Sequence, residues 1–309
     1  MSNLDLSVQL APRNVKGLLL ANPIMTASGT FGYGTEYAGI VDAGALGAVV
    51  CKGTTLNPRP GNPQPRLTET PAGILNSIGM ENIGVDALIR EKAPTWAAWN
   101  VPVLVNILGC DVDEYAELAR RLEGVPGVSG LEVNISCPNI AAGGAEFGAS
   151  PEDAAAVTRA VKSATSLPVT VKLSPNVTDI TAIARAAAEA GADALTVANT
   201  LRGMAIDVPR RRPVLGNITG GLSGPAIRPV ALYMVYQVAG EVGIPVIGCG
   251  GIASATDALE FFMAGASAVQ VGSATLTSPR ACLDILDGIL AFMEEEGATS
   301  LSEIVGAAR

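Results

Sequence analysis

Eight short runs of apolar and β-branched residues recur along the chain, and helical patterns separate them. They cover residues 23–28, 46–53, 102–109, 131–136, 168–174, 194–199, 245–251 and 268–273. Runs this continuously apolar are typical of parallel strands that are buried on both faces. Eight β/α units within 309 residues, with no linker between them, predict one closed (β/α)8 barrel, the TIM-barrel fold, spanning residues 1–309. An open doubly wound sheet is the alternative.

The clearest helical patterns cover residues 113–124, 151–164 and 179–191. Helix starts are predicted at Ser150, which precedes Pro151, and at Ser254. Two long stretches rich in Pro, Gly and Asn, residues 54–84 and 199–227, follow the second and sixth predicted strands. In a barrel both insertions lie on the C-terminal face, where active sites are found.

Composition excludes several classes of function. A formal net charge of −9 argues against a nucleic-acid-binding surface. No apolar run reaches 18 residues, so no membrane span is expected. The N-terminal segment lacks the basic and apolar regions of a signal peptide, and we therefore expect a cytoplasmic protein.

The chain contains no histidine, so acid–base chemistry must use Cys, Lys, Tyr or a carboxylate. Five cysteines stand at positions 51, 110, 137, 249 and 282, and none forms a CxxC pair. This spacing argues against a zinc site or an iron–sulfur cluster held by this chain, and no metal site is predicted.

Polar residues stand at or near the C-terminal ends of five consecutive predicted strands: Lys52, Asn106, Asn134, Lys172 and Asn199. Any one of them could be a rim side chain that bonds a loop, but five around a barrel point into one mouth. No acidic residue stands beside either lysine at its strand tip. We therefore expect the lysines to face an anionic ligand and an electron-rich cofactor ring.

The strand over 131–136 runs into the segment "NISCPN", which places two amides and a thiol at its end. A buried strand gains little from such residues. Cys137, followed by Pro138, is therefore a candidate general base, and a buried structural thiol is the alternative. Glu132 is expected to face away from the mouth, as part of the barrel framework.

Glycine-rich turns follow the last two predicted strands, "GCGGIAS" at 248–254 and "VGSA" at 271–274. Glycine lets backbone N–H groups approach phosphate oxygens, and barrels often bind phosphate at these two loops. The pair therefore predicts a phosphate site. Tight turns without a ligand are the alternative.

Several motifs occur in an order that matches one family over nearly the whole chain. They are "NPIMTASGTFGYG", "CKGTT", "NSIGMEN", "VNISCPN", "VKLSP", "ANT", "GGLSGPAIRP", "CGGI" and "VGSA". Together they resemble class 1 dihydroorotate dehydrogenases. The segments "SCPNIAAGGAEFG" and "GGLSGPAIRPVALYMVYQVA" are similar to the type B catalytic subunit.

The resemblance implies a flavin enzyme that binds one FMN per chain and oxidises dihydroorotate to orotate in de novo pyrimidine (UMP) biosynthesis. It also implies a partner subunit that carries FAD and a [2Fe–2S] cluster and passes electrons to NAD⁺. The two subunits would form a heterotetramer built on a homodimer of this chain. The absence of cluster-spaced cysteines agrees with that division.

The resemblance also implies roles for residues that match the motifs. Cys137 is the base. FMN contacts fall on Ser28, Lys52, Gly53, Asn106, Asn134, Lys172, Ala198, Gly224, Gly250, Gly251, Gly272 and Ser273. Pyrimidine contacts fall on Lys52, Asn76, Ser77, Ile78, Gly79, Met80, Asn134, Asn139, Asn199 and Thr200. Met80 stands where many relatives are expected to carry Leu, a change that conserves volume.

Three rival interpretations remain at this point. A type A enzyme would be a homodimer that uses fumarate. A tRNA dihydrouridine synthase is also a flavin barrel with a cysteine, but the acidic charge disfavours it. A non-catalytic barrel that binds a phosphate-bearing ligand would share the glycine loops and lack the reaction.

Overall fold

The computed structural model describes residues 4–37, 39–136, 138–139 and 145–309. Eight parallel strands form one sheet in the order β3-β18-β17-β12-β11-β8-β7-β4. Their bounds are β3 Ile24–Thr26, β4 Val49–Val50, β7 Val103–Ile107, β8 Gly130–Asn134, β11 Val169–Lys172, β12 Ala194–Val197, β17 Val246–Cys249 and β18 Ala268–Val271. A parallel bridge between Met25 and Ala48 joins the two ends of this order. The (β/α)8 barrel is thereby confirmed, and the open doubly wound sheet is wrong.

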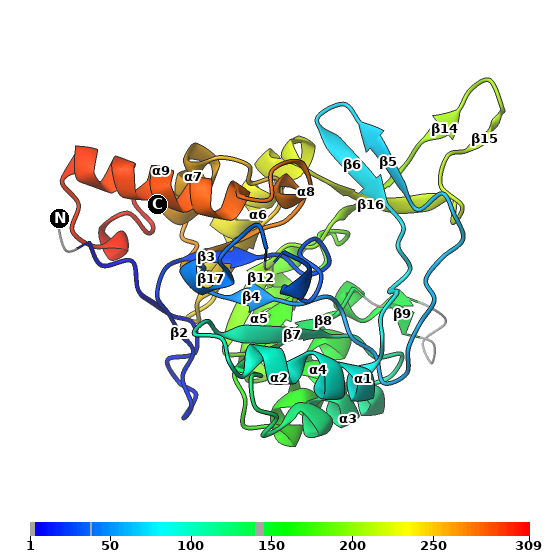
Figure 1. Cartoon of the computed structure of the whole chain (residues 1–309), viewed down its shortest axis with the longest axis horizontal. Coiled ribbons are helices and arrows are strands. Elements are labelled where there is room, and N and C mark those ends of the chain that lie inside the picture. The colour runs from blue at the N-terminus through cyan, green and yellow to red at the C-terminus, as the bar shows by residue number, and fades with distance from the viewer. Residues whose placement is uncertain (1–3, 38, 137, 140–144) are drawn as a thin grey trace.

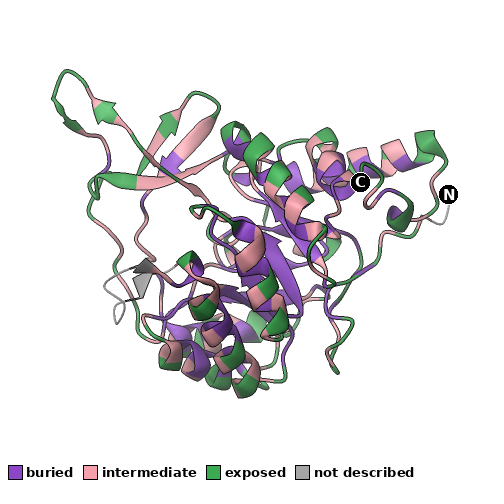
Figure 2. Ribbon diagram, turned by 180° about the vertical axis from the view of Figure 1, so that it is seen from behind, coloured by how far each residue is buried: buried purple, intermediate pink, exposed green. Residues whose placement is uncertain are grey.

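Helices cover the outside of the barrel, and their inner faces pack on the buried strands (Figures 1 and 2). The three helical patterns of the sequence become α3 Val112–Leu122, α4 Pro151–Ala164 and α5 Ile180–Glu189. The caps are also as predicted, because Ser150 accepts from the N–H of Asp153 and Ser254 from that of Asp257. The remaining helices are α1 Val85–Glu91, α2 Ala93–Trp96, α6 Arg228–Ala239, α7 Ala255–Met263, α8 Ala274–Thr277 and α9 Ala281–Glu296.

The two insertions fold together into one sheet at the mouth of the barrel. It contains β5 Leu67–Thr70 and β6 Gly73–Asn76 from the first insertion, with β13 Leu201–Met204 and β16 Thr219–Ser223 from the second. The antiparallel order is β13-β16-β6-β5. Their position was predicted, but the sheet was not, because its central pairing joins segments about 145 residues apart.

Smaller elements complete the description. A hairpin of β14 Ile206–Asp207 and β15 Arg212–Pro213 extends from the inserted sheet (Figure 1). Two further pairs are β1 Val8–Gln9 with β2 Leu19–Leu20, and β9 Pro138–Asn139 with β10 Ala145–Glu146. Short 3-10 turns lie at Thr35–Tyr37, Ala43–Ala45, Phe147–Ala149, Pro225–Ile227 and Leu301–Glu303. Among the helices of the described residues, none combines the length and the apolar character that a bilayer crossing requires.

The barrel closes where Gly47 passes the chain that enters β3. The Gly47 N–H donates to the carbonyl of Ile24 at 2.8 Å. A Cβ on Gly47 would lie 1.9 Å from the carbonyl oxygen of Asn22. Only a residue without a side chain therefore permits this approach.

Gly47→Ala is expected to destabilise the protein by about 3 kcal/mol or more, because the added methyl group overlaps backbone atoms that cannot move independently. Gly39→Ala is the matched control, since a Cβ there meets nothing within 4 Å. Urea unfolding of both variants measures the difference. Equal unfolding midpoints would contradict the role given to Gly47 at the seam.

Candidate active site

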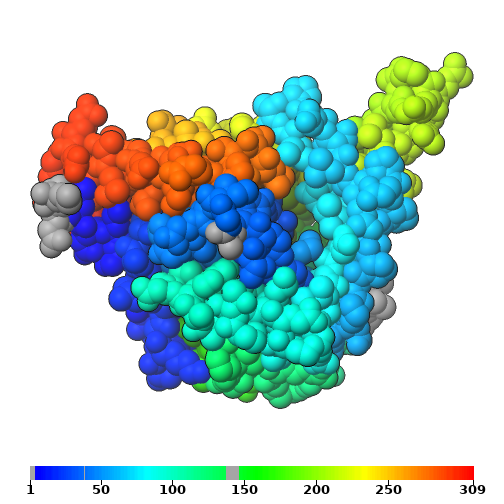
Figure 3. Space-filling view, in the orientation of Figure 1, coloured from blue at the N-terminus to red at the C-terminus, as the bar shows by residue number. Residues whose placement is uncertain are grey.

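A cavity of about 420 Å³ opens at the C-terminal ends of the barrel strands, beneath the inserted sheet. The space-filling view shows the surface hollowed between the cyan segment that contains β5 and β6 and the orange segment that contains α8 (Figure 3). A volume of this size lies in the range of pockets for small molecules and cofactors.

The structure brings nearly all predicted site residues to this cavity. The residues assigned to FMN by resemblance all line it: Ser28, Lys52, Gly53, Asn106, Asn134, Lys172, Ala198, Gly224, Gly250, Gly251, Gly272 and Ser273. Of the residues assigned to the pyrimidine alone, those on the wall are Asn76, Ile78, Met80, Asn199 and Thr200. Their contacts with ligands stay a prediction.

Ser77 and Gly79 do not line the cavity. The neighbouring residues Asn76, Ile78 and Met80 line the cavity instead. Ser77 instead accepts a hydrogen bond at its Oγ from Asn62 Nδ2 at 2.9 Å. Cys137 lies outside the described residues, and Asn139 is described only through its place in β9.

Lys52 follows β4 and is half-buried at the cavity wall. Its ammonium group makes no hydrogen bond or ion pair with any residue that the structure describes. Burial lowers the pKa of Lys52, and the more distant charge of Glu81 raises it only in part. An anionic ligand group at this wall would supply the missing partner.

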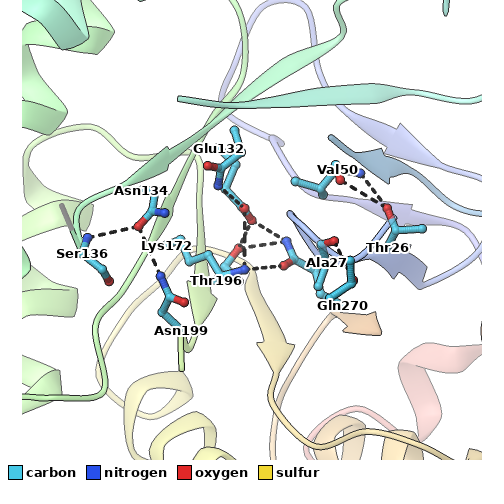
Figure 4. A network of polar contacts seen from close by, with 12 residues as sticks. Thr26, Ala27, Val50, Glu132, Asn134, Ser136, Lys172, Thr196, Asn199 and Gln270 are labelled. Carbon is cyan, nitrogen blue, oxygen red and sulfur yellow. Dashed lines mark hydrogen bonds and ion pairs between the residues drawn. The ribbon is translucent and has the colours of Figure 1, made fainter. Parts of the chain in front are cut away.

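Lys172, unlike Lys52, has an acidic neighbour inside the barrel. Its Nζ lies 3.8 Å from Oε1 of Glu132, and it donates to Oε1 of Gln270 at 3.1 Å. The prediction that neither lysine has an acidic neighbour is therefore wrong for Lys172. The prediction that Glu132 faces away from the mouth is also wrong. Side chains two residues apart on a strand share a face, so Glu132 lies inside the barrel on the same side of β8 as Asn134 (Figure 4).

Lys172 is protonated at neutral pH. Its side chain is 4% exposed, and burial by itself lowers the pKa. The carboxylate of Glu132 acts in the opposite direction, and the pKa of Lys172 is raised above its usual value. Burial raises the pKa of the Cys249 thiol, which therefore stays neutral. The cavity thus carries a fixed positive charge at the tip of β11.

Amide side chains form the polar part of the wall. Oδ1 of Asn134 accepts from Asn199 Nδ2 at 3.3 Å and from the N–H of Ser136 at 3.1 Å (Figure 4). Asn76 donates through Nδ2 to the carbonyl of Gly221 at 3.2 Å, which ties it to the inserted sheet. Oδ1 of Asn106 is buried and has no hydrogen-bond partner among the described residues. Such an orphaned acceptor indicates a missing donor.

The two glycine-rich turns lie together on the same wall. Gly250 and Gly251 follow β17, and Gly272 and Ser273 follow β18. Gly251 has φ +77°, and a Cβ there would lie 2.8 Å from the carbonyl oxygen of Gly224. A side chain is therefore excluded at Gly251, and Gly250 and Gly251 both line the cavity, where the backbone of such a turn can bind an oxyanion.

Several residues of the site were not found from the sequence. Cys249, Glu81 and Ser223 line the cavity, while Glu132, Thr196 and Gln270 lie beneath it. The last three are polar residues within otherwise apolar strands. Glu132 stands two residues before the cavity residue Asn134, and Gln270 stands two residues before the cavity residue Gly272. That spacing is the signal that could have revealed them.

Residues 10–293 match the family model described as dihydroorotate dehydrogenase. This chain belongs to the dihydroorotate dehydrogenase family. The motif-based resemblance is thereby confirmed, and the rival tRNA dihydrouridine synthase is set aside.

Three relatives within this family carry the name dihydroorotate dehydrogenase B (NAD(+)), catalytic subunit. The protein of Pelobacter propionicus is 58% identical over 294 residues, which cover 95% of this chain and 97% of that protein. The protein of Geotalea uraniireducens is 53% identical over 307 residues and covers 99% of both chains. The protein of Desulforudis audaxviator is 57% identical over 294 residues, 95% of this chain and 96% of that protein.

Lys52→Met is expected to stabilise the substrate-free protein by about 0.5–1 kcal/mol at neutral pH, because it removes a buried charge that lacks a partner. The pKa of Lys52 is lower in the folded state than its usual 10.5. The destabilisation is therefore complete below the folded-state pKa and fades as the pH rises toward 10.5. Urea unfolding at pH values from neutral to alkaline measures this gain.

Lys92→Met is the matched control. Lys92 Nζ lies 3.6 Å from Glu36 and 5.1 Å from the ring centroid of Tyr33, so that its charge has partners. Its replacement is expected to lower stability. A loss of stability in both variants would contradict the account of Lys52.

Proposed function

We propose that this chain is the FMN-binding catalytic subunit of an NAD⁺-linked dihydroorotate dehydrogenase, which oxidises dihydroorotate to orotate in pyrimidine biosynthesis. The observation that carries the proposal is the convergence of the residues assigned to the flavin and to the pyrimidine on one cavity. The names of near-full-length relatives support the same reaction.

The cavity fits the chemistry of FMN. The glycine turns after β17 and β18 suit a phosphate group. The orphaned Oδ1 of Asn106 needs a donor such as a ring N–H, and the ammonium of Lys172 suits an electron-rich ring edge. When bound, FMN supplies the hydride acceptor of the reaction.

The substrate would lie under the inserted sheet. Amides suit a pyrimidine because each offers donors and an acceptor to the imide edges, and Asn76, Asn134 and Asn199 all line the cavity. Lys52, which lacks a partner among the described residues, would bind the carboxylate of the substrate. The inserted sheet positions Asn76 through its bond to Gly221.

Cys137 is the proposed general base that removes the proton from carbon 5 of dihydroorotate. Although it lies outside the described residues, the end of β8 that precedes it is firmly held. The hydroxyl of Tyr115 donates to the carbonyl of Asn134 at 2.6 Å. The ring of Tyr115 also meets Phe147 edge-on, with centroids 5.5 Å apart. The strand end that precedes Cys137 in the sequence is therefore held by a hydrogen bond and a ring contact.

The proposal includes a partner. A second subunit with FAD and a [2Fe–2S] cluster would carry electrons to NAD⁺, in a heterotetramer built on a homodimer of this chain. The words "catalytic subunit" in the relatives' names support a partner. Co-purification of an iron-containing subunit that enables NAD⁺ reduction tests it, and fumarate-dependent turnover by this chain alone would favour the type A alternative.

The decisive experiment for the activity is anaerobic mixing of the purified protein with dihydroorotate. The protein is expected to be yellow and to lose its flavin absorbance as orotate forms. A yellow protein that keeps its absorbance would contradict the reaction. A colourless protein that binds no FMN would favour the non-catalytic phosphate-binding barrel instead.

Cys137→Ala is expected to slow flavin reduction by dihydroorotate about 10²–10⁴-fold, the usual contribution of a general base. In the unaltered protein the same rate should rise with pH, because a free thiol ionises near pH ~8.5. Stopped-flow measurement of the first turnover checks both. Cys249→Ala is the matched control, since that neutral buried thiol has no role as base. An equal loss in both variants would contradict the assignment.

A further inference from the structure

A closed polar network lies inside the barrel, directly beneath the cavity, and the proposed reaction does not use its central residue (Figure 4). Glu132 is 0% exposed. Its Oε1 accepts from Asn106 Nδ2 at 2.7 Å. Its Oε2 accepts from Thr196 Oγ1 at 3.0 Å and from Gln270 Nε2. Three hydrogen bonds and the nearby ammonium of Lys172 therefore satisfy this carboxylate.

A carboxylate can only accept hydrogen bonds, and this fixes the orientation of both neighbouring amides. Asn106 and Gln270 must each turn an NH₂ group toward Glu132. Their oxygens are thereby turned the other way. A neutral amide at position 132 would impose no such choice, because it can donate as well as accept.

The oxygens of the two amides are directed toward the cavity wall and toward Lys172. Oδ1 of Asn106 is buried and has no hydrogen-bond partner among the described residues. It lies close to the cavity wall, because a Cβ on the cavity residue Gly53 would be 3.0 Å from it. Oε1 of Gln270 accepts from Lys172 Nζ at 3.1 Å. Glu132 thus presents an acceptor at Asn106 and a held cation at Lys172 to whatever occupies the cavity.

The negative charge of Glu132 also offsets the positive charge of Lys172. Lys172 is 4% exposed at the cavity wall, and the Glu132 carboxylate lies 3.8 Å behind it. Without the carboxylate, the same ammonium would act on the cavity with its full positive field. An excess positive field favours the electron-rich, reduced form of a bound flavin.

We propose that Glu132 is a positioning residue that sets the polarity of the flavin site. It acts through the orientation of Asn106 and through the held, charge-balanced Lys172, and so tunes both the affinity for FMN and its reduction potential. This inference rests on the proposed binding of FMN, but not on dihydroorotate as the substrate.

Glu132→Gln in the FMN-loaded protein tests the proposal. The reduction potential is measured by anaerobic chemical titration against a reference dye, and the FMN dissociation constant by recovery of flavin fluorescence. We expect the potential to become more positive by at least about 30 mV, which is tenfold in the equilibrium constant for two-electron reduction. We expect oxidised FMN to bind at least tenfold more weakly.

Two further variants separate tuning from a merely structural role. Thr26→Val removes a buried hydroxyl of the same barrel, which bonds Val50 N at 3.0 Å and does not touch Glu132. It should lower stability and leave the potential unchanged. In a Lys172→Met background, Glu132→Gln should shift the potential by clearly less than in the wild-type background, because the cation, one of the two groups through which Glu132 acts, is gone.

Unchanged potential and FMN affinity in Glu132→Gln would overturn the proposal, and so would a full shift in the Lys172→Met background. If Glu132→Gln does not fold, Gln270→Met breaks the link to Lys172 and should shift the potential in the same direction by a smaller amount. An unchanged potential there would overturn the proposal as well. Failure of dihydroorotate to reduce the wild-type flavin would overturn the proposed function, while the chemical titration still decides the role of Glu132.

Discussion

The ion pair between Lys172 and Glu132 is the constraint on which the site depends. Burying two charges is unfavourable unless both find partners of good geometry, and removal of one partner leaves the other uncompensated. The ion pair and the side chains that bond to it form one network with members on five different strands of the barrel: Asn106, Glu132, Lys172, Thr196 and Gln270. A slip of one residue in any of these strands would turn its member of the network toward the helices. The network therefore fixes the strand register and the chemistry of the cavity floor together.

The roof of the cavity has a different origin. The barrel alone would leave the strand tips open, and the inserted sheet covers them with β6 and the strand β16 that pairs with it. Asn76 belongs to this roof, while Lys52 and Asn134 belong to the barrel. A ligand between the two layers meets amides from both. The floor is built from side chains that hydrogen-bond to one another across the barrel strands, and the roof is made from segments that the barrel does not need in order to close.

Much of this arrangement could be predicted from the sequence, because it follows from local patterns. Apolar runs predicted the eight strands, serine caps predicted the starts of α4 and α7, and polar strand tips predicted the mouth. The errors concern relations between distant segments. The partner of Lys172 stands on the neighbouring strand, and the inserted sheet pairs residues of two separate insertions. Ser77 and Gly79 entered the site by family resemblance, although the structure does not place them on the cavity wall.

The central claim is that Glu132 orients the groups that meet the cofactor. A crystal structure of the FMN-bound protein, at a resolution that distinguishes amide nitrogen from oxygen, tests it most directly. The account predicts that Asn106 keeps Nδ2 on Glu132 and turns Oδ1 to the flavin ring, with Lys172 contacting the ring while it stays bound to Gln270. A flavin ring out of reach of both residues, or an Asn106 amide turned with its oxygen toward Glu132, would contradict the account.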